Sequence, residues 1–178
     1  MSADKGAYRG GRESIELALG MMTIKLYTDE ELKELRDMSK RVTNPRARWL
    51  KKPTHNPSHR QKSFRVLSEQ DENLRFEVYQ RQNIQDDQDF SCGIAFLPPG
   101  GSRLTLARYN GPSHQHEDIF YRSHIHRATA KAISAGKRAE HEAEETSRYE
   151  TLEGALYCLI KDFHLTGIVA KEDHPRLF

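Results

Sequence analysis

The stretch LRFEVY, residues 74–79, decides the fold class that the sequence predicts. Apolar and polar side chains alternate through it, and successive side chains of an extended chain point to opposite faces. One face is therefore apolar and the other polar, as in a strand with one buried face. The apolar side chains are those of Leu74, Phe76 and Val78.

Four further stretches have a strand-like composition, and turn-sized gaps separate most of them. The turn Pro98-Pro99-Gly100-Gly101 divides two of them. Consecutive short strands of this kind predict an antiparallel sheet of about five strands. The four stretches are FRVLS (64–68), DFSCGIAFL (89–97), SRLTLARY (102–109) and IFYRSHIHR (119–127).

Two amphipathic helices flank these strands. TDEELKELRDMSKRV (28–42) begins with Thr28 and Glu31 at the spacing of a capping box, and Asn44-Pro45 stops it. TLEGALYCLIKDF (151–163) has Thr151 as its cap, and we expect it to cover the sheet. The fold class predicted is α+β, with an N-terminal helix, the antiparallel sheet and a C-terminal covering helix. A short helix is also predicted over 128–136, closed by Gly136.

The length of 178 residues suits one domain. We predict a mobile N-terminal extension over 1–22, a single α+β domain over 23–168 and a C-terminal tail over 169–178. The two isolated cysteines, Cys92 and Cys158, are typical of a reducing compartment. No apolar run reaches the roughly 20 residues that span a bilayer, so we expect a cytoplasmic protein that does not enter the membrane.

The charge is distributed unevenly along the chain. Residues 41–62 contain seven basic residues and no acidic one, whereas residues 137–153 contain six glutamates and three basic residues. Trp49 could stack on a base while the neighbouring cations hold phosphates. It could instead anchor to the core the proline-rich loop that we expect over residues 46–62. The candidate nucleic-acid-binding residues are Arg46, Arg48, Trp49, Lys51 and Lys52.

The stretch RYNGPSHQHEDIFYRSHIHRATAK, residues 108–131, contains four of the nine histidines. His124 and His126 are two apart, so on a strand they share a face, opposite Ile119, Tyr121, Ser123 and Ile125. His114 and His116 precede that strand, and Glu117 or Asp118 could orient the imidazoles. His55 and His59 would join them if the proline-rich loop folds over.

Three interpretations of this stretch remain open. The four histidines His114, His116, His124 and His126 could bind a divalent transition metal such as zinc. They could instead perform metal-independent phosphodiester chemistry, with Arg108 and Arg127 binding the phosphate. They could also be ordinary polar groups of a binding surface without chemistry.

Several motifs occur in the order seen in a family of small bacterial proteins of unknown function. They are LYTDEELKELRDM, LARYNGPSHQH, SHIHRATAKAISAG, AEETSRY and LEGALYCLIKDF, within residues 24–168. More distantly, the chain resembles TumE-type toxins of toxin–antitoxin modules. The resemblance implies a toxin or defence-associated role and a cognate antitoxin partner. Asn110 stands where those toxins have a carboxylate.

The sequence therefore predicts a ribonuclease-like or nucleotide-acting protein with a His/Arg site, either metal-independent or metal-assisted. One alternative is a non-catalytic binding module, such as an antitoxin or a subunit of a defence complex. Another is a metal-binding protein built on the histidine cluster.

Overall fold

The structure, a computed structural model, describes residues 25–51 and 58–173. These ranges hold three helices and nine strands. In chain order they are α1 (Asp29–Asp37), β1 (Lys40–Val42), β2 (Leu50–Lys51), β3 (His59–Ser68), β4 (Arg75–Asn83), β5 (Phe90–Leu97), β6 (Leu104–Asn110), β7 (His124–Arg127), α2 (Ala130–Ser134), β8 (Ala143–Glu145), α3 (Leu152–Asp162) and β9 (Leu165–Thr166).

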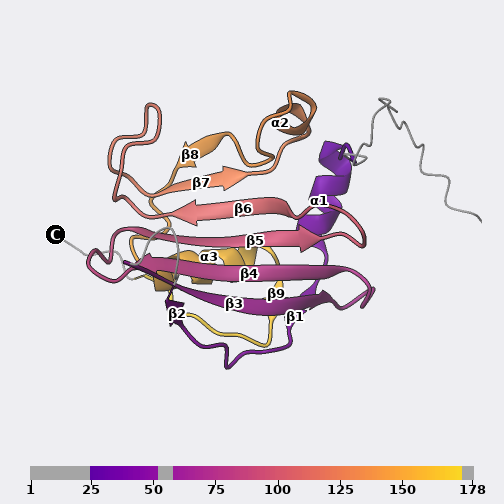
Figure 1. Ribbon diagram of the computed structural model, residues 1–178, viewed down its shortest axis with the longest axis horizontal. Helices are drawn as coiled ribbons and strands as arrows, with labels where there is room; N and C mark the ends of the chain where they lie inside the picture. Colours follow the sequence, from indigo (N-terminus) through magenta and orange to yellow (C-terminus); the bar gives the residue numbers. More distant parts are fainter. Residues whose placement is uncertain (1–24, 52–57, 174–178) are drawn as a thin grey trace, which may run out of the picture.

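All nine strands belong to one sheet, whose order is β8-β7-β6-β5-β4-β3-β1-β9, with β2 paired to β3 (Figure 1). Strands β3 to β8 pair antiparallel with their neighbours, and β1 and β9 form the parallel pair. The α+β class and the antiparallel meander are confirmed. The predicted number of about five strands is wrong, because β1, β2, β8 and β9 are too short to show a period-two pattern.

Helix α1 begins as predicted and ends earlier. Thr28 and Glu31 form both hydrogen bonds of the capping box, at 3.1 and 3.0 Å. The helix ends at Asp37, and the next residues form β1, which pairs with β3 and β9. The prediction of one helix to Val42 is wrong, because Val42 belongs to strand β1, from which its side chain is buried in the core.

The predicted fifth strand is also shorter than expected. Only His124–Arg127 pairs as β7, and residues 119–123 belong to the loop before it. Tyr121, expected to point inward, is 66% exposed and has a φ of 49°. The backbone therefore turns at Tyr121, and the alternation of side chains begins only at His124.

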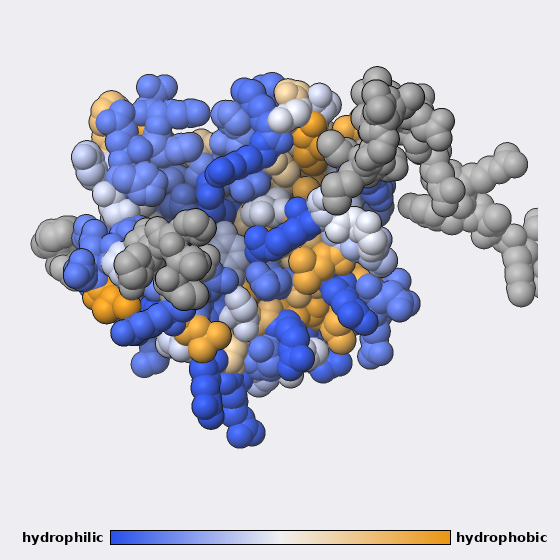
Figure 2. All heavy atoms as spheres, in the orientation of Figure 1, coloured by the Kyte–Doolittle hydropathy of each residue, from blue (hydrophilic) through white to orange (hydrophobic). Residues whose placement is uncertain are grey.

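The two longer helices and the apolar side chains lie on one face of the sheet. Helix α3 packs mainly against β5, and it lies behind the sheet in Figure 1. Leu156 and Leu159 of α3 join the core formed by alternate residues of the central strands, such as Cys92 and Ile94. Among the described residues, no helix packs over β4 to β7 on the opposite face of the sheet, and Figure 2 shows many hydrophilic side chains there.

The residues that the sequence assigns to a tail begin with a segment packed on α3. Asp173 accepts hydrogen bonds from Glu150 N at 2.6 Å and from Thr151 N at 2.9 Å, at the start of the helix. A side chain at Gly154 would collide with the Asp173 carboxylate. The predicted extension over 1–22 lies outside the described residues. No helix in the described ranges is both long and apolar enough to cross a membrane.

Lys40 connects α1 to α3 from a fully buried position. Its Nζ donates to the carbonyl oxygens of Arg36, Met38 and Phe163 at 2.9, 2.7 and 3.3 Å. From β1 its side chain reaches the last carbonyls of α1, the end of a helix that favours a cation. Burial lowers the pKa of Lys40 to about 7.

We expect Lys40→Met to remove a pH dependence of stability. The pKa of lysine in an unfolded chain is about 10.4, so between pH 7 and that value the unfolded chain binds more protons than the folded one. The free energy of unfolding of the wild type should therefore rise with pH in this window, by up to about 1.4 kcal/mol per pH unit. Urea unfolding at pH 7 to 9.5 measures this slope.

Lys131→Met, at an exposed side chain, is the control and should keep the wild-type slope. Parallel pH profiles for the wild type and Lys40→Met would contradict the assignment of a lowered pKa to Lys40.

Candidate functional site

The candidate site lies on the sheet face that faces away from α3, where the register aligns polar side chains in two rows. One row crosses from β7 to β4 and consists of His124, Asn110, Ser91 and Arg81. The second row consists of His126, Arg108, Gly93 and Tyr79. Residues directly opposite each other on neighbouring strands share a face, so both rows lie on one surface.

The loop between β6 and β7 adds two more imidazoles to this surface. His116 and Ile119 form an isolated antiparallel bridge, with Glu117 in a left-handed conformation at the turn (φ 50°). The ring centroid of His116 lies 4.6 Å from that of His126 and 5.2 Å from that of His124. His114 lies 5.8 Å from His124. The prediction that three or four imidazoles come together is confirmed.

Hydrogen bonds determine the tautomers of the two buried imidazoles. His124 Nδ1 lies 2.9 Å from the carbonyl oxygen of Arg122, and His126 Nδ1 lies 3.1 Å from that of Glu140. A carbonyl oxygen only accepts, so both Nδ1 atoms carry the proton, and each neutral ring has its lone pair on Nε2. The carboxylates of Glu117 and Asp118, predicted as orienters, are replaced in that role by these backbone carbonyls.

Burial keeps both rings neutral. It lowers the pKa of His124, and the neighbouring His116, His114 and Arg108 add to this effect against the hydrogen bond to Arg122. Burial lowers the pKa of His126 to about 3, with further contributions from the Arg108 guanidinium and His124. The exposed fractions of His124 and His126 are 0% and 1%. Both Nε2 atoms therefore have a lone pair at neutral pH, which in His124 faces the Asn110 amide and in His126 has no partner among the described residues.

Three of the histidines could hold a metal ion. One ring nitrogen from each of His116, His124 and His126 lies within 4.8 Å of the others. The Nε2 atoms of His116 and His126 are buried and have no hydrogen-bond partner among the described residues. Asn110 Nδ2 lies 3.1 Å from the Nε2 atom of His124, so this amide would have to move when a metal binds. An all-imidazole set suits zinc, copper, nickel or iron better than magnesium or calcium.

The histidines form one wall of a cavity of about 280 Å³. Two arginines, Arg81 and Arg108, also line it, and their buried Nε atoms have no hydrogen-bond partner. Neither guanidinium forms an ion pair with a carboxylate in the described ranges. The full lining is His59, Arg81, Asp89, Phe90, Ser91, Arg108, Asn110, His114, His116 and His126.

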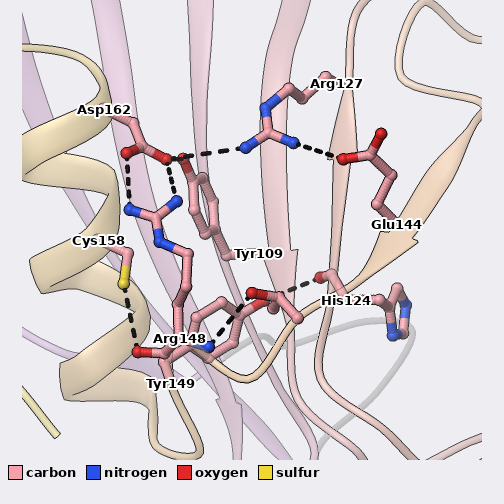
Figure 3. Close-up of polar contacts among 9 residues, drawn as sticks. Tyr109, His124, Arg127, Glu144, Arg148, Tyr149, Cys158 and Asp162 are labelled. Atoms are coloured by element: carbon pink, nitrogen blue, oxygen red, sulfur yellow. Dashed lines mark hydrogen bonds and ion pairs between the residues drawn. The ribbon is translucent and has the colours of Figure 1, made fainter.

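The opposite side of the sheet fixes the strand ends that carry the site. Tyr149 Oη lies 2.8 Å from the carbonyl oxygen of His124 and 3.1 Å from that of Asn110, and the His124 imidazole points away from it (Figure 3). Asp162 of α3 accepts from Tyr109 Oη at 2.6 Å and from both terminal nitrogens of Arg148 at 2.7 Å. These contacts attach β6 and β7 to α3 and hold the register.

Several predicted site residues lie elsewhere. Arg127, predicted to bind phosphate beside Arg108, points to the α3 face, where it pairs with Glu144 at 3.2 Å and lies 3.9 Å from Asp162 (Figure 3). Successive residues of β7 point to opposite faces, so Arg127 cannot share the face of His126.

The described nucleic-acid-binding candidates also lie outside the cavity lining. Arg46, Arg48 and Lys51 are exposed, while Trp49 is partly buried against the core and lies 4.6 Å from the Arg60 guanidinium. This contact supports the anchoring role of Trp49. Lys52 and His55 lie outside the described residues.

The sequence did not identify five of the residues that line the cavity. Four of them reach the histidines only through the register: Arg81 of β4, Asp89 of the turn after it, and Phe90 and Ser91 of β5. Continuing the alternation of LRFEVY places Arg81 on the polar face with Tyr79, which was the one available signal. The sequence shows Asn110 where TumE-type toxins have a carboxylate, but it gives no sign of the contact between Asn110 and His124.

Comparison with protein-family models, with curated proteins and with solved structures found no match for this chain.

We expect the purified protein to bind about one equivalent of zinc through His116, His124 and His126. His126→Ala removes a ligand, so it should lower the affinity at least about 100-fold, since even outer-shell changes cost 10- to 100-fold. Elemental analysis of the stoichiometry and calorimetric titration with ZnCl₂ measure both quantities.

His141→Ala is the matched control because His141 lies outside the cavity lining and the metal group. A His126→Ala variant that binds zinc with wild-type affinity would contradict the site.

Proposed function

We propose that this chain is a cytoplasmic enzyme that cleaves phosphodiester bonds of RNA or nucleotides, with a transition metal bound by His116, His124 and His126. One observation supports the proposal: two members of the group with convergent ring nitrogens, His116 and His126, line the same cavity as two arginines without carboxylate partners, and His124, the third member, lies beside them. Phosphate esters present the negative charge that such arginines bind, and guanidinium groups match phosphate geometry well.

The metal-assisted form of the reaction fits the imidazoles better than the metal-independent form. With a pKa of about 3, His126 is a neutral ring and a weak base at neutral pH, and its one N–H is bonded to the Glu140 carbonyl oxygen. Neutral rings that donate Nδ1–H to a carbonyl are instead well suited as metal ligands through Nε2. His116, His124 and His126 would hold the ion, and the chemistry that it would supply is a water of lowered pKa as the attacking group.

The dimensions of the cavity favour one nucleotide unit at a time. A volume of about 280 Å³ lies at the lower end of the range for small-molecule sites. A single-stranded segment or a nucleotide would fit there with its phosphate over Arg81 and Arg108. Duplex RNA would need its strands separated first.

We expect cleavage of the RNA dinucleotide uridylyl-3′,5′-uridine by the zinc-loaded protein and a loss of kcat/KM of about 100-fold or more in Arg108→Ala. The reason is that a guanidinium in a secluded cavity stabilises the charge that develops on the phosphate, and removing one such donor typically costs about this factor. Product formation followed by chromatography gives the rate.

Arg65→Ala, an exposed arginine on β3, is the matched control and should retain full activity. A zinc-loaded wild type that binds uridine nucleotides and cleaves none of the dinucleotide, a longer RNA or a nucleoside triphosphate would favour the non-catalytic binding module instead.

We also expect expression of the protein to slow bacterial growth, as the toxin or defence-associated role requires. The double variant His124→Ala/His126→Ala should relieve the inhibition because it removes two of the three ligands. Growth curves of induced cultures, with immunoblots for equal protein levels, measure the effect.

The single variant His141→Ala should inhibit growth like the wild type. Undiminished inhibition by the folded double variant would exclude the histidine group as the source of toxicity. Co-expression with neighbouring genes would then search for the antitoxin partner that this role implies.

A further inference from the structure

An imidazole–carboxylate pair lies in the same cavity, on the side away from His116 and His126. His59 Nε2 lies 3.0 Å from Asp89 Oδ2, and both residues line the cavity. Asp89 also accepts from Asn83 Nδ2 at 3.1 Å, which fixes its carboxylate. His59 is 5% exposed, whereas Asp89 is partly exposed, and neighbouring side chains define the orientation of both.

The strand order separates this pair from the metal group. His59 is on β3 and His124 and His126 are on β7, with β4, β5 and β6 between them. Adjacent strands lie about 4.8 Å apart, so the backbones of β3 and β7 are about 19 Å apart. The side chains of His59 and His126 lie on the same face of the sheet and form opposite walls of the cavity. Arg81 on β4 and Arg108 on β6 form the floor between the walls.

This arrangement matches the needs of an in-line displacement at phosphorus. The attacking and leaving oxygens lie on opposite sides of the phosphorus atom, so the groups that assist them must be on opposite sides too. The metal group occupies one wall, the arginines occupy the position of the phosphate oxygens, and His59 with Asp89 occupies the other wall.

We propose that His59, oriented by Asp89, is the general acid that protonates the leaving oxygen of a phosphodiester bound over Arg81 and Arg108. The proposal rests on the proposed function and names its substrate class: an ester whose leaving group is an unactivated alkoxide, such as the 5′-oxygen of a nucleotide. Such a leaving group has a high pKa and departs slowly without a proton, whereas a good leaving group needs none.

The attacking oxygen is that of a water molecule, which loses a proton to solvent. Its lone pair forms the new O–P bond, and the electron pair of the breaking P–O bond stays on the leaving oxygen. That oxygen takes the proton from Nδ1 of the His59 imidazolium, which lies 3.3 Å from Ser58 Oγ before the reaction. Asp89 keeps its hydrogen bond from Nε2–H throughout, and neutral His59 regains a proton from solvent afterwards.

A sulfur substitution in the substrate tests this role. The probes are uridylyl-3′,5′-uridine and the same dinucleotide with its bridging 5′-oxygen replaced by sulfur, whose thiolate leaves without protonation. The variant His59→Gln keeps an amide that can donate to Asp89. We expect it to lose about 100-fold or more in kcat on the oxygen substrate and less than about 5-fold on the sulfur substrate.

Equal losses on the two substrates would overturn the proposal and assign His59 a structural role. His141→Gln is the matched control and should cleave both probes at the wild-type rate. Asp89→Asn provides a second variant. We expect its kcat on the oxygen substrate to fall less than that of His59→Gln, and its kcat on the sulfur substrate to stay near the wild-type value.

The zinc stoichiometry of each variant separates this proposal from the proposed function. It should stay at the wild-type value because neither His59 nor Asp89 belongs to the metal group. If the zinc-loaded wild type cleaves neither probe, the proposed function fails. If it cleaves the probes and His59→Gln does so equally well, only the role of His59 fails.

Discussion

The cross-strand register of β4 to β7 is the constraint on which the candidate site depends. It places Asn110 opposite His124 and Arg108 opposite His126. A slip of one residue in β7 would turn both imidazoles toward α3 and bring Ile125 into the cavity. The Tyr149 hydroxyl opposes such a slip because it bonds to the carbonyl oxygens of both Asn110 and His124. The side of the sheet that packs the core therefore maintains the geometry of the side that carries the site.

The two faces of the central strands meet opposite physical requirements. On the α3 face, residues such as Cys92 and Ile94 are fully buried in an apolar core, and their burial stabilises the fold. On the other face, Arg108 and His126 are withdrawn from water without a compensating charge, which costs stability. Apolar side chains would suit these positions better if folding were the only requirement. The uncompensated polar groups thus indicate a ligand, because locally unfavourable residues concentrate at functional sites.

Local patterns predicted the elements that are long enough to show a period. LRFEVY, the Thr28–Glu31 capping box and the helix over 151–163 all correspond to described elements. The short strands were missed because two or three residues contain no alternation, and their pairing is a tertiary property. The same distinction applies to the site. His114 to His126 are close in sequence and were grouped correctly, whereas Arg81 and Asp89 join them only through pairing across several strands. The prediction that Arg127 shares the site with Arg108 is wrong, because Arg127 follows His126 directly on β7 and points to the other face of the sheet.

The charges of the cavity couple metal binding to anion binding. A divalent cation on His116, His124 and His126 would lie beside Arg108, whose guanidinium already lowers the pKa of His126. Without an anion, this positive charge would oppose the metal. A phosphate over Arg81 and Arg108 offsets it, so the bound anion must raise the affinity for the metal. By linkage, the metal raises the affinity for the anion by the same factor. In the proposed function, each ligand would therefore bind more tightly in the presence of the other, which suits a substrate that carries negative charge.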